Sequence, residues 1–384
     1  MRFAVFALVV GAAISSHSQE TPGQPHKKSS SPFVQFDPVS KALLQPLHGQ
    51  KSPLAWRKDF PGGWPAWRKA AREKLWELLG MDRMAAVAVK HRVNVKLGEV
   101  TQEDGYQRQR GEIETEPGVF IPFWVLTPTD SLSNKRPVAL CAHGHDSDGW
   151  NTYAGVYRDE KHRRETLAKE GSPGVEAVRR GYVAVVPATR GLAKAVSITD
   201  RKGRHGNRNC RAQLVHCLLA GRTPLGERVW DSQRIIDWII QDLQGVDTKK
   251  LVMLGNSGGG VLTLYAAALD DRIRVAIPSC SFTSFTSAEG FIFHCDCCLI
   301  PRAQSELCDL SDIGALAAPR ALLAVHGRKD GLHHFDDVQN AMERVHLIYR
   351  AADAGDRFEH RWGDQGHQFY PQFIWPFIEK ELEE

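Results

Sequence analysis

"LVMLGNSGGGVLTLYAAAL", residues 251–269, decides the fold, because in it an apolar strand pattern runs directly into an apolar helix pattern. Between the two patterns, Gly255-Asn256-Ser257-Gly258-Gly259 matches the motif G-x-S-x-G. The motif needs small residues two positions before and after the serine, since the chain turns sharply there and lifts the hydroxyl clear of the backbone. The stretch therefore predicts a nucleophilic serine, Ser257, on a strand-to-helix turn.

Short apolar runs recur on both sides of this stretch, and helical segments such as residues 226–243 separate them. Each run is typical of a buried parallel strand. The alternation predicts an α/β fold with a mostly parallel central sheet and helices on both faces. Alternating residues on either side of Pro117-Gly118 predict a hairpin that precedes these strands. The predicted parallel strands are 137–142, 182–188, 250–255, 274–279 and 320–327.

The N-terminal part of the chain differs in composition from the rest. Residues 1–18 contain one arginine, then a short apolar run and then small residues, which is the layout of a secretory signal peptide. A membrane anchor is the alternative interpretation of this segment. Residues 19–100 predict a flexible leader and a helical extension whose helix ends at Gly80. The catalytic domain is expected over residues 101–384. We therefore expect a secreted or periplasmic protein, without membrane contact after signal cleavage.

A nucleophilic serine needs a histidine base and a carboxylate that orients the base, and in this architecture they follow in the order serine, acid, histidine. Asp330 follows the predicted strand 320–327, and His367 follows a later strand-like stretch. Both stand at carboxyl ends of strands, where open α/β sheets build their sites. The competing acids Asp336 and Asp337 stand where the next helix should begin, so helix capping is the better interpretation for them.

Four other histidines compete for the role of the base. His346 falls on a predicted helix and His360 within a predicted strand. His333 and His334 are too close to Asp330 in sequence for the expected geometry, although either could line the pocket. His367 is therefore the predicted base.

The oxyanion of the reaction needs backbone donors. One is expected from the N–H of Gly258, directly after the nucleophile. The second should come from the loop His143-Gly144-His145-Asp146 that follows strand 137–142, and we favour the main chain of His145. For the rings of His143 and His145, a structural role and a catalytic role both remain open.

From about Tyr106 to Glu384, the chain resembles an α/β-hydrolase of the dienelactone-hydrolase-like and acetyl xylan esterase-like branch. The resemblance implies that Ser257 is the nucleophile, Asp330 the acid and His367 the base, with no metal or organic cofactor. Dienelactone hydrolases proper use cysteine in place of the serine. The segments that carry the resemblance are HGH (143–145), PATRG (187–191), LLAGRTPLGERVWDSQRIIDWI (218–239) and GNSGGG (255–260).

The resemblance leaves the substrate open. Gly258 and Leu192 stand where acetyl esterases of the cephalosporin-C deacetylase type have glutamine.

Residues 281–316 form an insertion longer than a plain helical crossover, and we expect it to overhang the pocket as a cap. In an exported protein an even number of cysteines can pair, so a disulfide is expected in the cap. A zinc site with His294 ranks below a disulfide and free thiols, because no second C-x-x-C or H-x-x-x-H pair stands at the usual spacing. Four of the eight cysteines lie in this region: Cys295, Cys297, Cys298 and Cys308.

The expected function is that of a serine carboxylic-ester hydrolase of the acetyl xylan type, acting on a small-molecule or polysaccharide ester through an acyl-enzyme. The 49 basic and 45 acidic side chains are scattered and leave a net charge of only +4, which speaks against nucleic-acid binding. The alternatives are a peptidase of the prolyl-oligopeptidase type and a non-catalytic binding protein of the same fold. Acyl group, alcohol partner and oligomeric state are left open.

Overall fold

The computed structural model describes residues 38–48, 51–130, 135–200, 202–204, 208–287 and 292–383. The predicted signal peptide and the first part of the leader lie outside the described residues. Among the described residues, no helix is both long and apolar enough to cross a membrane.

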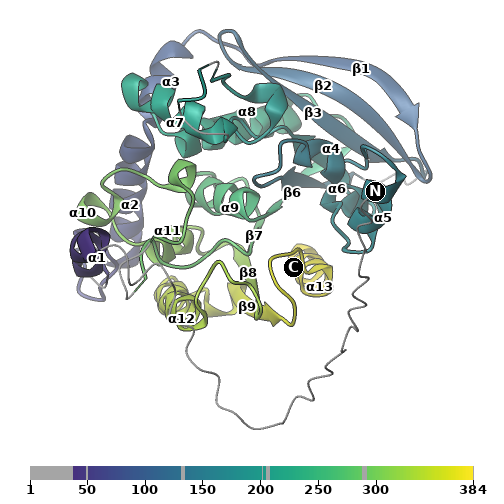
Figure 1. The fold of residues 1–384 in the computed structure, drawn as a ribbon. Helices are drawn as coiled ribbons and strands as arrows, with labels where there is room; N and C mark the ends of the chain where they lie inside the picture. Colours follow the sequence, from purple (N-terminus) through teal and green to yellow (C-terminus); the bar gives the residue numbers. More distant parts are fainter. Residues whose placement is uncertain are drawn as a thin grey trace, which may run out of the picture.

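The centre of the molecule is one nine-stranded sheet with the order β1-β2-β3-β5-β4-β6-β7-β8-β9 (Figure 1). The pairs β1–β2, β2–β3 and β3–β5 are antiparallel, and all pairs from β5–β4 to β8–β9 are parallel. The predicted hairpin and the mostly parallel sheet are therefore confirmed. The strands are β1 (Asn94–Gln102), β2 (Tyr106–Glu116), β3 (Val119–Pro128), β4 (Arg136–Ala142), β5 (Val183–Pro187), β6 (Val246–Asn256), β7 (Val275–Ser279), β8 (Ala321–Gly327) and β9 (Phe358–Gly363).

Helices cover both faces of the sheet, as predicted (Figure 1). The α-helices are α1 (Pro38–Leu44), α2 (Gly63–Leu79), α3 (Met81–Val87), α4 (Gly149–Tyr153), α5 (Glu160–Leu167), α6 (Pro173–Arg179), α7 (Asn209–Ala220), α8 (Pro224–Gln241), α9 (Gly258–Leu269), α10 (Ala303–Glu306), α11 (Leu310–Ala315), α12 (Phe335–Ala351) and α13 (Pro371–Glu383). Short 3₁₀ turns are η2 (Gln45–Leu47), η3 (Lys194–Val196), η4 (Asp296–Cys298) and η5 (Gly355–Arg357).

The alternation of side chains along the central strands produces two hydrophobic cores. In β4, Val138 and Leu140 face the core that contains α2, α8, α9, α11 and α12, whereas Ala139 and Cys141 face the core that contains α6 and α13. All four side chains are fully buried. Because the central strands are buried on both faces, their sequences are continuous apolar runs, which is the pattern that predicted them.

The N-terminal extension packs on the main domain through the predicted helix, α2. This helix ends at Gly80, which takes a left-handed conformation with φ of 75°, and its Trp67 is completely buried. The predicted boundary between residues 100 and 101 falls inside β1, so the sheet begins earlier than expected. Nearly every residue of β1 is exposed, and the short alternation of Val93, Val95 and Leu97 with polar residues is the only strand signal that its sequence carries.

Candidate active site

Ser257 lies on a strained turn between β6 and α9, as the motif predicts. Its φ of 57° and ψ of −125° are rare for a residue with a side chain and cost on the order of 1–3 kcal/mol. Two backbone hydrogen bonds hold the turn: Ser257 N–H donates to the Ser279 carbonyl at 2.9 Å, and Val261 N–H donates to the Ser257 carbonyl at 2.9 Å. These bonds hold the serine at the N-terminus of a twelve-residue helix despite the strain.

The glycines of the motif let β6, α9 and the end of β4 approach closely. A Cβ added at Gly255 would lie 2.5 Å from the Gly259 carbonyl, and one added at Gly259 would lie 2.0 Å from the carbonyl oxygen of Ala142. Both distances are impossible contacts, so any larger residue would push α9 away from the sheet. The small residues are therefore a packing requirement of the turn that carries Ser257.

Asp330 and His367 lie at the ends of the neighbouring strands β8 and β9, and the fold brings them together. His367 Nδ1–H donates to Asp330 Oδ2 at 2.7 Å, and Leu332 N–H donates to Asp330 Oδ1 at 3.0 Å. Burial alone would raise the pKa of Asp330, but these two hydrogen bonds outweigh it and lower the pKa. Asp330 is therefore an ionised carboxylate that holds one nitrogen of the His367 ring and leaves the other available.

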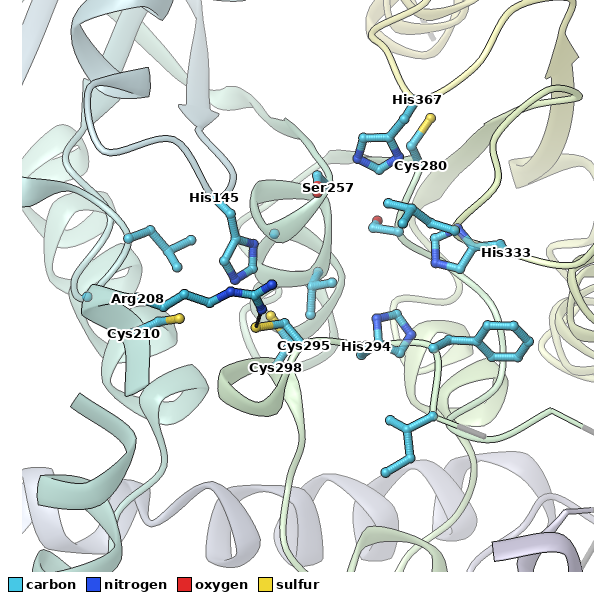
Figure 2. A pocket seen from close by; sticks show the side chains of 18 of the residues that line it. His145, Arg208, Cys210, Ser257, Cys280, His294, Cys295, Cys298, His333 and His367 are labelled. Carbon is cyan, nitrogen blue, oxygen red and sulfur yellow. Dashed lines mark hydrogen bonds between the residues drawn. The ribbon is translucent and has the colours of Figure 1, made fainter. Parts of the chain in front are cut away.

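Ser257 and His367 line the same cavity, which has a volume of about 930 Å³ (Figure 2). This volume is large enough for a small organic ligand or part of a polymer. The cap contributes to its wall, since residues Phe293, His294 and Cys295 line it. The expected overhang of the cap over the pocket agrees with this lining.

The competing acids lie at the start of the next helix, as expected, but neither caps it: the N-cap residue of α12 is His334, and no side chain forms a capping hydrogen bond there. Asp336 and Asp337 lie in the first turn of α12, where their charge favours the helix N-terminus. Neither residue lines the cavity, whereas Asp330 contacts His367 directly.

The competing histidines are also separated from the base position. His346 lies on α12, and His360 lies in β9 with its Nε2 3.1 Å from His326 Nδ1. His333 does line the cavity, but its Nδ1 is 4.0 Å from Asp330 Oδ2, too far for a hydrogen bond. Burial lowers the pKa of His333 to about 4.

Cys280 is a second potential nucleophile that sequence reasoning missed. It follows β7, lines the cavity, and its sulfur lies within 4.8 Å of ligand atoms of Asp330 and His367. Burial raises the pKa of the Cys280 thiol to about 11, and its Sγ donates to the Gln368 carbonyl at 3.3 Å. At neutral pH it is a protonated thiol, which is a poor nucleophile, so Ser257 remains the better candidate.

His143, in the loop after β4, has a structural role. Its ring is fully buried; Nε2 accepts from Thr189 N–H at 2.9 Å, and Nδ1–H donates to the Gly144 carbonyl at 2.9 Å. Burial lowers the pKa of the ring to about 4, so it remains neutral. These bonds tie the loop after β4 to the loop after β5. The ring of His143, whose role the sequence left open, is therefore structural.

The same loop packs directly against the turn at Ser257. A Cβ added at Gly144 would lie 3.2 Å from the backbone nitrogen of Gly258, and one added at Gly258 would lie 2.7 Å from His145 Nδ1. Among the described residues, neither the Gly258 N–H nor the His145 N–H donates a hydrogen bond. The two predicted oxyanion donors are thus neighbouring, unused N–H groups beside Ser257.

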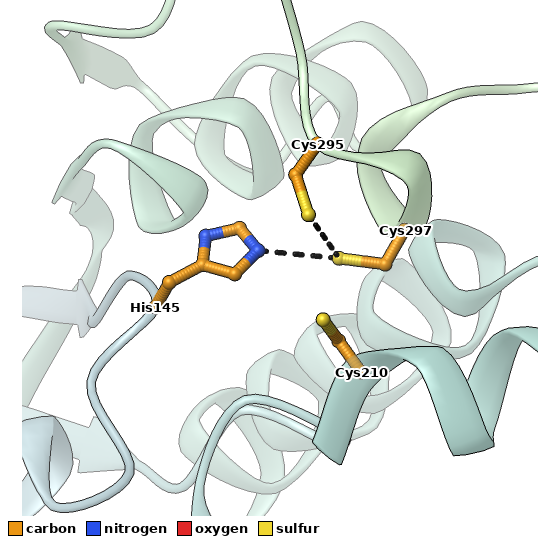
Figure 3. Close-up of side chains that lie close together, drawn as sticks. All are labelled: His145, Cys210, Cys295 and Cys297. Carbon is orange, nitrogen blue, oxygen red and sulfur yellow. Dashed lines mark hydrogen bonds between the residues drawn. The ribbon is translucent and has the colours of Figure 1, made fainter. Parts of the chain in front are cut away.

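The disulfide expected in the cap is wrong for this structure, in which all eight cysteines are free thiols. Cys295 Sγ and Cys297 Sγ are 3.8 Å apart, far beyond the S–S bond length of about 2.05 Å. Instead, the turn η4 directs both sulfurs toward two residues outside the cap, His145 and Cys210 (Figure 3). We call His145, Cys210, Cys295 and Cys297 the cysteine–histidine cluster.

The groups of this cluster perturb one another strongly. Hydrogen bonds with Cys210, Cys295 and Cys298 hold the pKa of the Cys297 thiol well below its usual value, although burial opposes them. Burial lowers the pKa of His145, but hydrogen bonds with Cys295 and Cys297 outweigh it and raise the pKa to about 9. Considered without a metal, the hydrogen bonds within the cluster therefore favour the charged forms of His145 and Cys297 over their neutral forms.

The sequence was compared with protein families and with known proteins. The model of the Abhydrolase family matches residues 26–278, a range that includes Ser257 and ends before Asp330 and His367. The hydrolase-named protein YtaP of Bacillus subtilis (strain 168) is 27% identical over 173 residues, which are 42% of this chain and 56% of the relative. The alignment thus spans about half of that relative's length.

Solved structures share the fold at low sequence identity. A protein from Bacteroides fragilis NCTC 9343 assigned as an acetyl xylan esterase has a TM-score of 0.68 and 18% identity, covering 89% of this chain and 94% of its own. Methylesterase BT1017 has a TM-score of 0.61 and 21% identity over 82% and 63% of the two chains. A CE15 glucuronoyl esterase from Caldicellulosiruptor kristjansonii has a TM-score of 0.55 and 16% identity over 83% and 86%. The predicted α/β-hydrolase fold is confirmed.

Proposed function

Because this chain belongs to the Abhydrolase family, we propose that it is a serine carboxylic-ester hydrolase with Ser257 as nucleophile, His367 as base and Asp330 as the carboxylate that orients the base. One observation carries the proposal. Ser257 lies on a strained strand-to-helix turn with φ of 57°, and it shares a cavity with a histidine whose Nδ1 is 2.7 Å from a buried carboxylate. A binding protein has no need to maintain that strain beside that pair.

The reaction then proceeds through an acyl-enzyme. Ser257 Oγ attacks the ester carbonyl carbon while His367 Nε2 accepts the hydroxyl proton, and the Asp330 carboxylate stabilises the resulting imidazolium through Nδ1–H. The tetrahedral intermediate collapses as the C–O bond of the alcohol breaks, and the alcohol leaves with the proton from His367. A water molecule, deprotonated by His367, then attacks the acyl-enzyme, releases the carboxylic acid and restores Ser257.

The developing oxyanion is stabilised by two backbone donors in this mechanism. Gly258 N–H belongs to the first residue of α9, so the positive end of the helix dipole adds to the hydrogen bond. His145 N–H is the second donor, from the loop that packs against Gly258. Neither N–H has to break an existing hydrogen bond to serve, which is the condition for a preorganised oxyanion hole.

The substrate class in this proposal is an ester of a carbohydrate. Its support is that several solved proteins of the same fold are named as acetyl xylan, methyl or glucuronoyl esterases. The cavity agrees with a polar substrate, because Arg208, Asn209 and His333 line it beside Ser257. The apolar run in residues 1–18 supports export, which would bring the enzyme to extracellular polysaccharides.

The test measures turnover of nitrophenyl acetate and of a peptide nitroanilide by the purified protein. Polysaccharides are then screened for release of acetate, of methanol, or of the alcohol from a glucuronoyl ester. We expect ester cleavage without amide cleavage, and one dominant product from the polysaccharides. Amide cleavage at a comparable rate would favour a peptidase, and a folded protein that cleaves neither class would contradict the proposal.

Export is tested separately by N-terminal sequencing of the protein recovered from the medium or periplasm. We expect the mature chain to begin close to residue 19. A chain recovered only from the cytoplasm with Met1 intact would contradict export without affecting the proposed chemistry.

A further inference from the structure

The cysteine–histidine cluster collects four soft ligand atoms at one point. His145 comes from the loop after β4, Cys210 from the first turn of α7, and Cys295 and Cys297 from the cap (Figure 3). One ligand atom from each residue lies within 4.8 Å of all the others. We propose that these four residues bind a zinc ion, and that the ion joins the cap and α7 to the loop beside Ser257.

The distances agree with tetrahedral coordination. Zn–S bonds of about 2.3 Å and a Zn–N bond of about 2.0–2.1 Å place neighbouring ligand atoms about 3.8 Å apart for two sulfurs and about 3.6 Å apart for nitrogen and sulfur. Cys295 Sγ and Cys297 Sγ are 3.8 Å apart, and His145 Nε2 is 3.2 Å from Cys297 Sγ. These two pairs are within about 0.4 Å of the tetrahedral spacing, and the remaining pairs, all within 4.8 Å, need shifts of at most about 1 Å to coordinate an ion.

A buried arginine supplies a second, independent observation. Arg228 is 1% exposed, and its guanidinium donates to the carbonyls of Arg190 and Cys297 and to the side chain of Gln213. Among the described residues it forms no ion pair with a carboxylate. Its Nη1 lies 3.4 Å from Cys297 Sγ. A buried guanidinium needs a neighbouring negative charge, and thiolate sulfur is the candidate that the structure supplies.

Charge balance favours an ion with three thiolate ligands. Three thiolates, a neutral imidazole and Zn²⁺ leave one negative charge, which the adjacent Arg228 neutralises. Arg208 adds a second cation at the exposed edge, with Nη1 3.6 Å from Cys295 Sγ. A metal-free imidazolium–thiolate pair, with the Cys210 and Cys295 thiols hydrogen-bonded to Cys297 Sγ, would satisfy Arg228 too, and the metal analysis below separates the two states.

The four ligands, and the contacts that hold the ligand-bearing segments together, favour zinc in a structural role. Three thiolates and one imidazole form a closed tetrahedral set of the kind that structural zinc sites use, and soft sulfur ligands select against magnesium, calcium and manganese. The ligand-bearing segments are also held together outside the cluster, because Arg211 of α7 donates to Asp296 of η4 at 2.8 Å. Preorganised ligands lower the entropy that metal binding must overcome.

The position of the site links it to the proposed active site. The His145 ring lies between the cluster and Gly258, with Nε2 toward Cys297 and Nδ1 toward the turn. An ion bound to Nε2 would immobilise the loop whose backbone N–H is the proposed oxyanion donor. This consequence rests on the proposed function; the metal site itself does not.

The experiment determines metal bound to the full-length protein, purified without a metal-affinity tag after expression with added zinc. Metal content is measured by inductively coupled plasma mass spectrometry. The ion is then replaced with Co²⁺, whose absorption spectrum reveals thiolate ligands by a sulfur-to-cobalt charge-transfer band. We expect about one zinc per chain, and a charge-transfer band in the cobalt form.

Matched variants assign the ligands. Cys295→Ser and Cys210→Ser should lose zinc, whereas Cys298→Ala, which removes a thiol one residue from Cys297 and outside the cluster, should keep it. If the ligand variants do not fold, release of zinc from the wild-type protein by a mercurial thiol reagent still shows that thiolates hold the ion. Ser257→Ala should keep the full zinc content, so failure of the esterase proposal is distinguishable from failure of this one.

Three results would overturn the metal site. The first is a folded protein that binds no metal after incubation with zinc and has all eight thiols open to alkylation on unfolding, which is the metal-free cluster. The second is an intact mass that reveals a disulfide among the four residues. The third is a zinc content that is unchanged by both Cys295→Ser and Cys210→Ser.

Discussion

The turn at Ser257 and the cysteine–histidine cluster lie on one cavity, yet the chain encodes them in opposite ways. The residue types that the turn requires all stand within residues 255–259, although Ser279 and Ala142 from neighbouring strands contact it. The cluster takes its members from three segments that no spacing rule connects, and only the fold brings them together. The comparison teaches that a site built by backbone geometry can be read from a short motif, whereas a site built by convergence of side chains cannot.

The largest effect is expected from removing the Ser257 hydroxyl, a change that leaves the cysteine–histidine cluster intact. Ser257→Ala should reduce kcat for nitrophenyl acetate by about 10⁶-fold, because the protonated Cys280 thiol is too poor a nucleophile to replace the serine hydroxyl. Its zinc content and thermal unfolding should match the wild type, since alanine fits the turn. Cys280→Ser is the matched control and should retain most of the activity; a loss as large as that of Ser257→Ala would move the nucleophile to Cys280.

A second variant tests whether the carboxylate partner was chosen correctly. Asp330→Asn should lower kcat by about 10⁴-fold, because an amide cannot hold the His367 ring in the tautomer that accepts a proton from serine. Asp336→Asn, at an exposed position in the first turn of α12, should have little effect on kcat. Steady-state kinetics of the two variants decide the matter, and the reverse order of effects would reject Asp330.

A third variant weakens the cluster without touching its ligands. Arg228→Gln removes the buried positive charge beside Cys297 Sγ, so zinc affinity measured by competition with a chelator should fall by about 10–100-fold. Arg228→Lys retains the charge, so its zinc affinity should lie between that of Arg228→Gln and that of the wild type. Zinc binding by Arg228→Gln that is as tight as in the wild type would show that the arginine does not support the metal.

The smallest expected effect is a pH dependence of stability at the Asp330–His367 pair. The pKa of Asp330 is lowered in the folded protein, so its ionised form adds stability above the pKa of the unfolded chain and loses it as the pH falls through the folded value. The difference in unfolding free energy between wild type and Asp330→Asn should therefore shrink on acidification below about pH 4. Urea unfolding of both proteins across this range provides the measurement; a difference that grows with acidity would contradict the assigned shift.

Local patterns were enough to predict most of the fold and the residues of the turn. The apolar runs that became β4 to β8 are buried on both faces, and burial of that kind leaves a continuous signal in the sequence. Gly255 and Gly259 are readable for a related reason, since the close approach of α9 and β4 excludes any side chain at both positions. Asp330 and His367 followed from chain order and strand ends alone.

Only the tertiary structure decided which side chains meet across the sheet. The disulfide was the wrong expectation because cysteine counts do not reveal in which direction η4 presents its sulfurs. Likewise the sequence left the rings of His143 and His145 equivalent, yet one is bonded to Thr189 inside the core and the other faces three cysteines. β1 was missed although Val93, Val95 and Leu97 alternate with polar residues, since an exposed edge strand leaves only a short signal of this kind. Backbone conformation and burial act on consecutive residues and so leave a local record, whereas contacts between distant segments depend on how the whole chain packs.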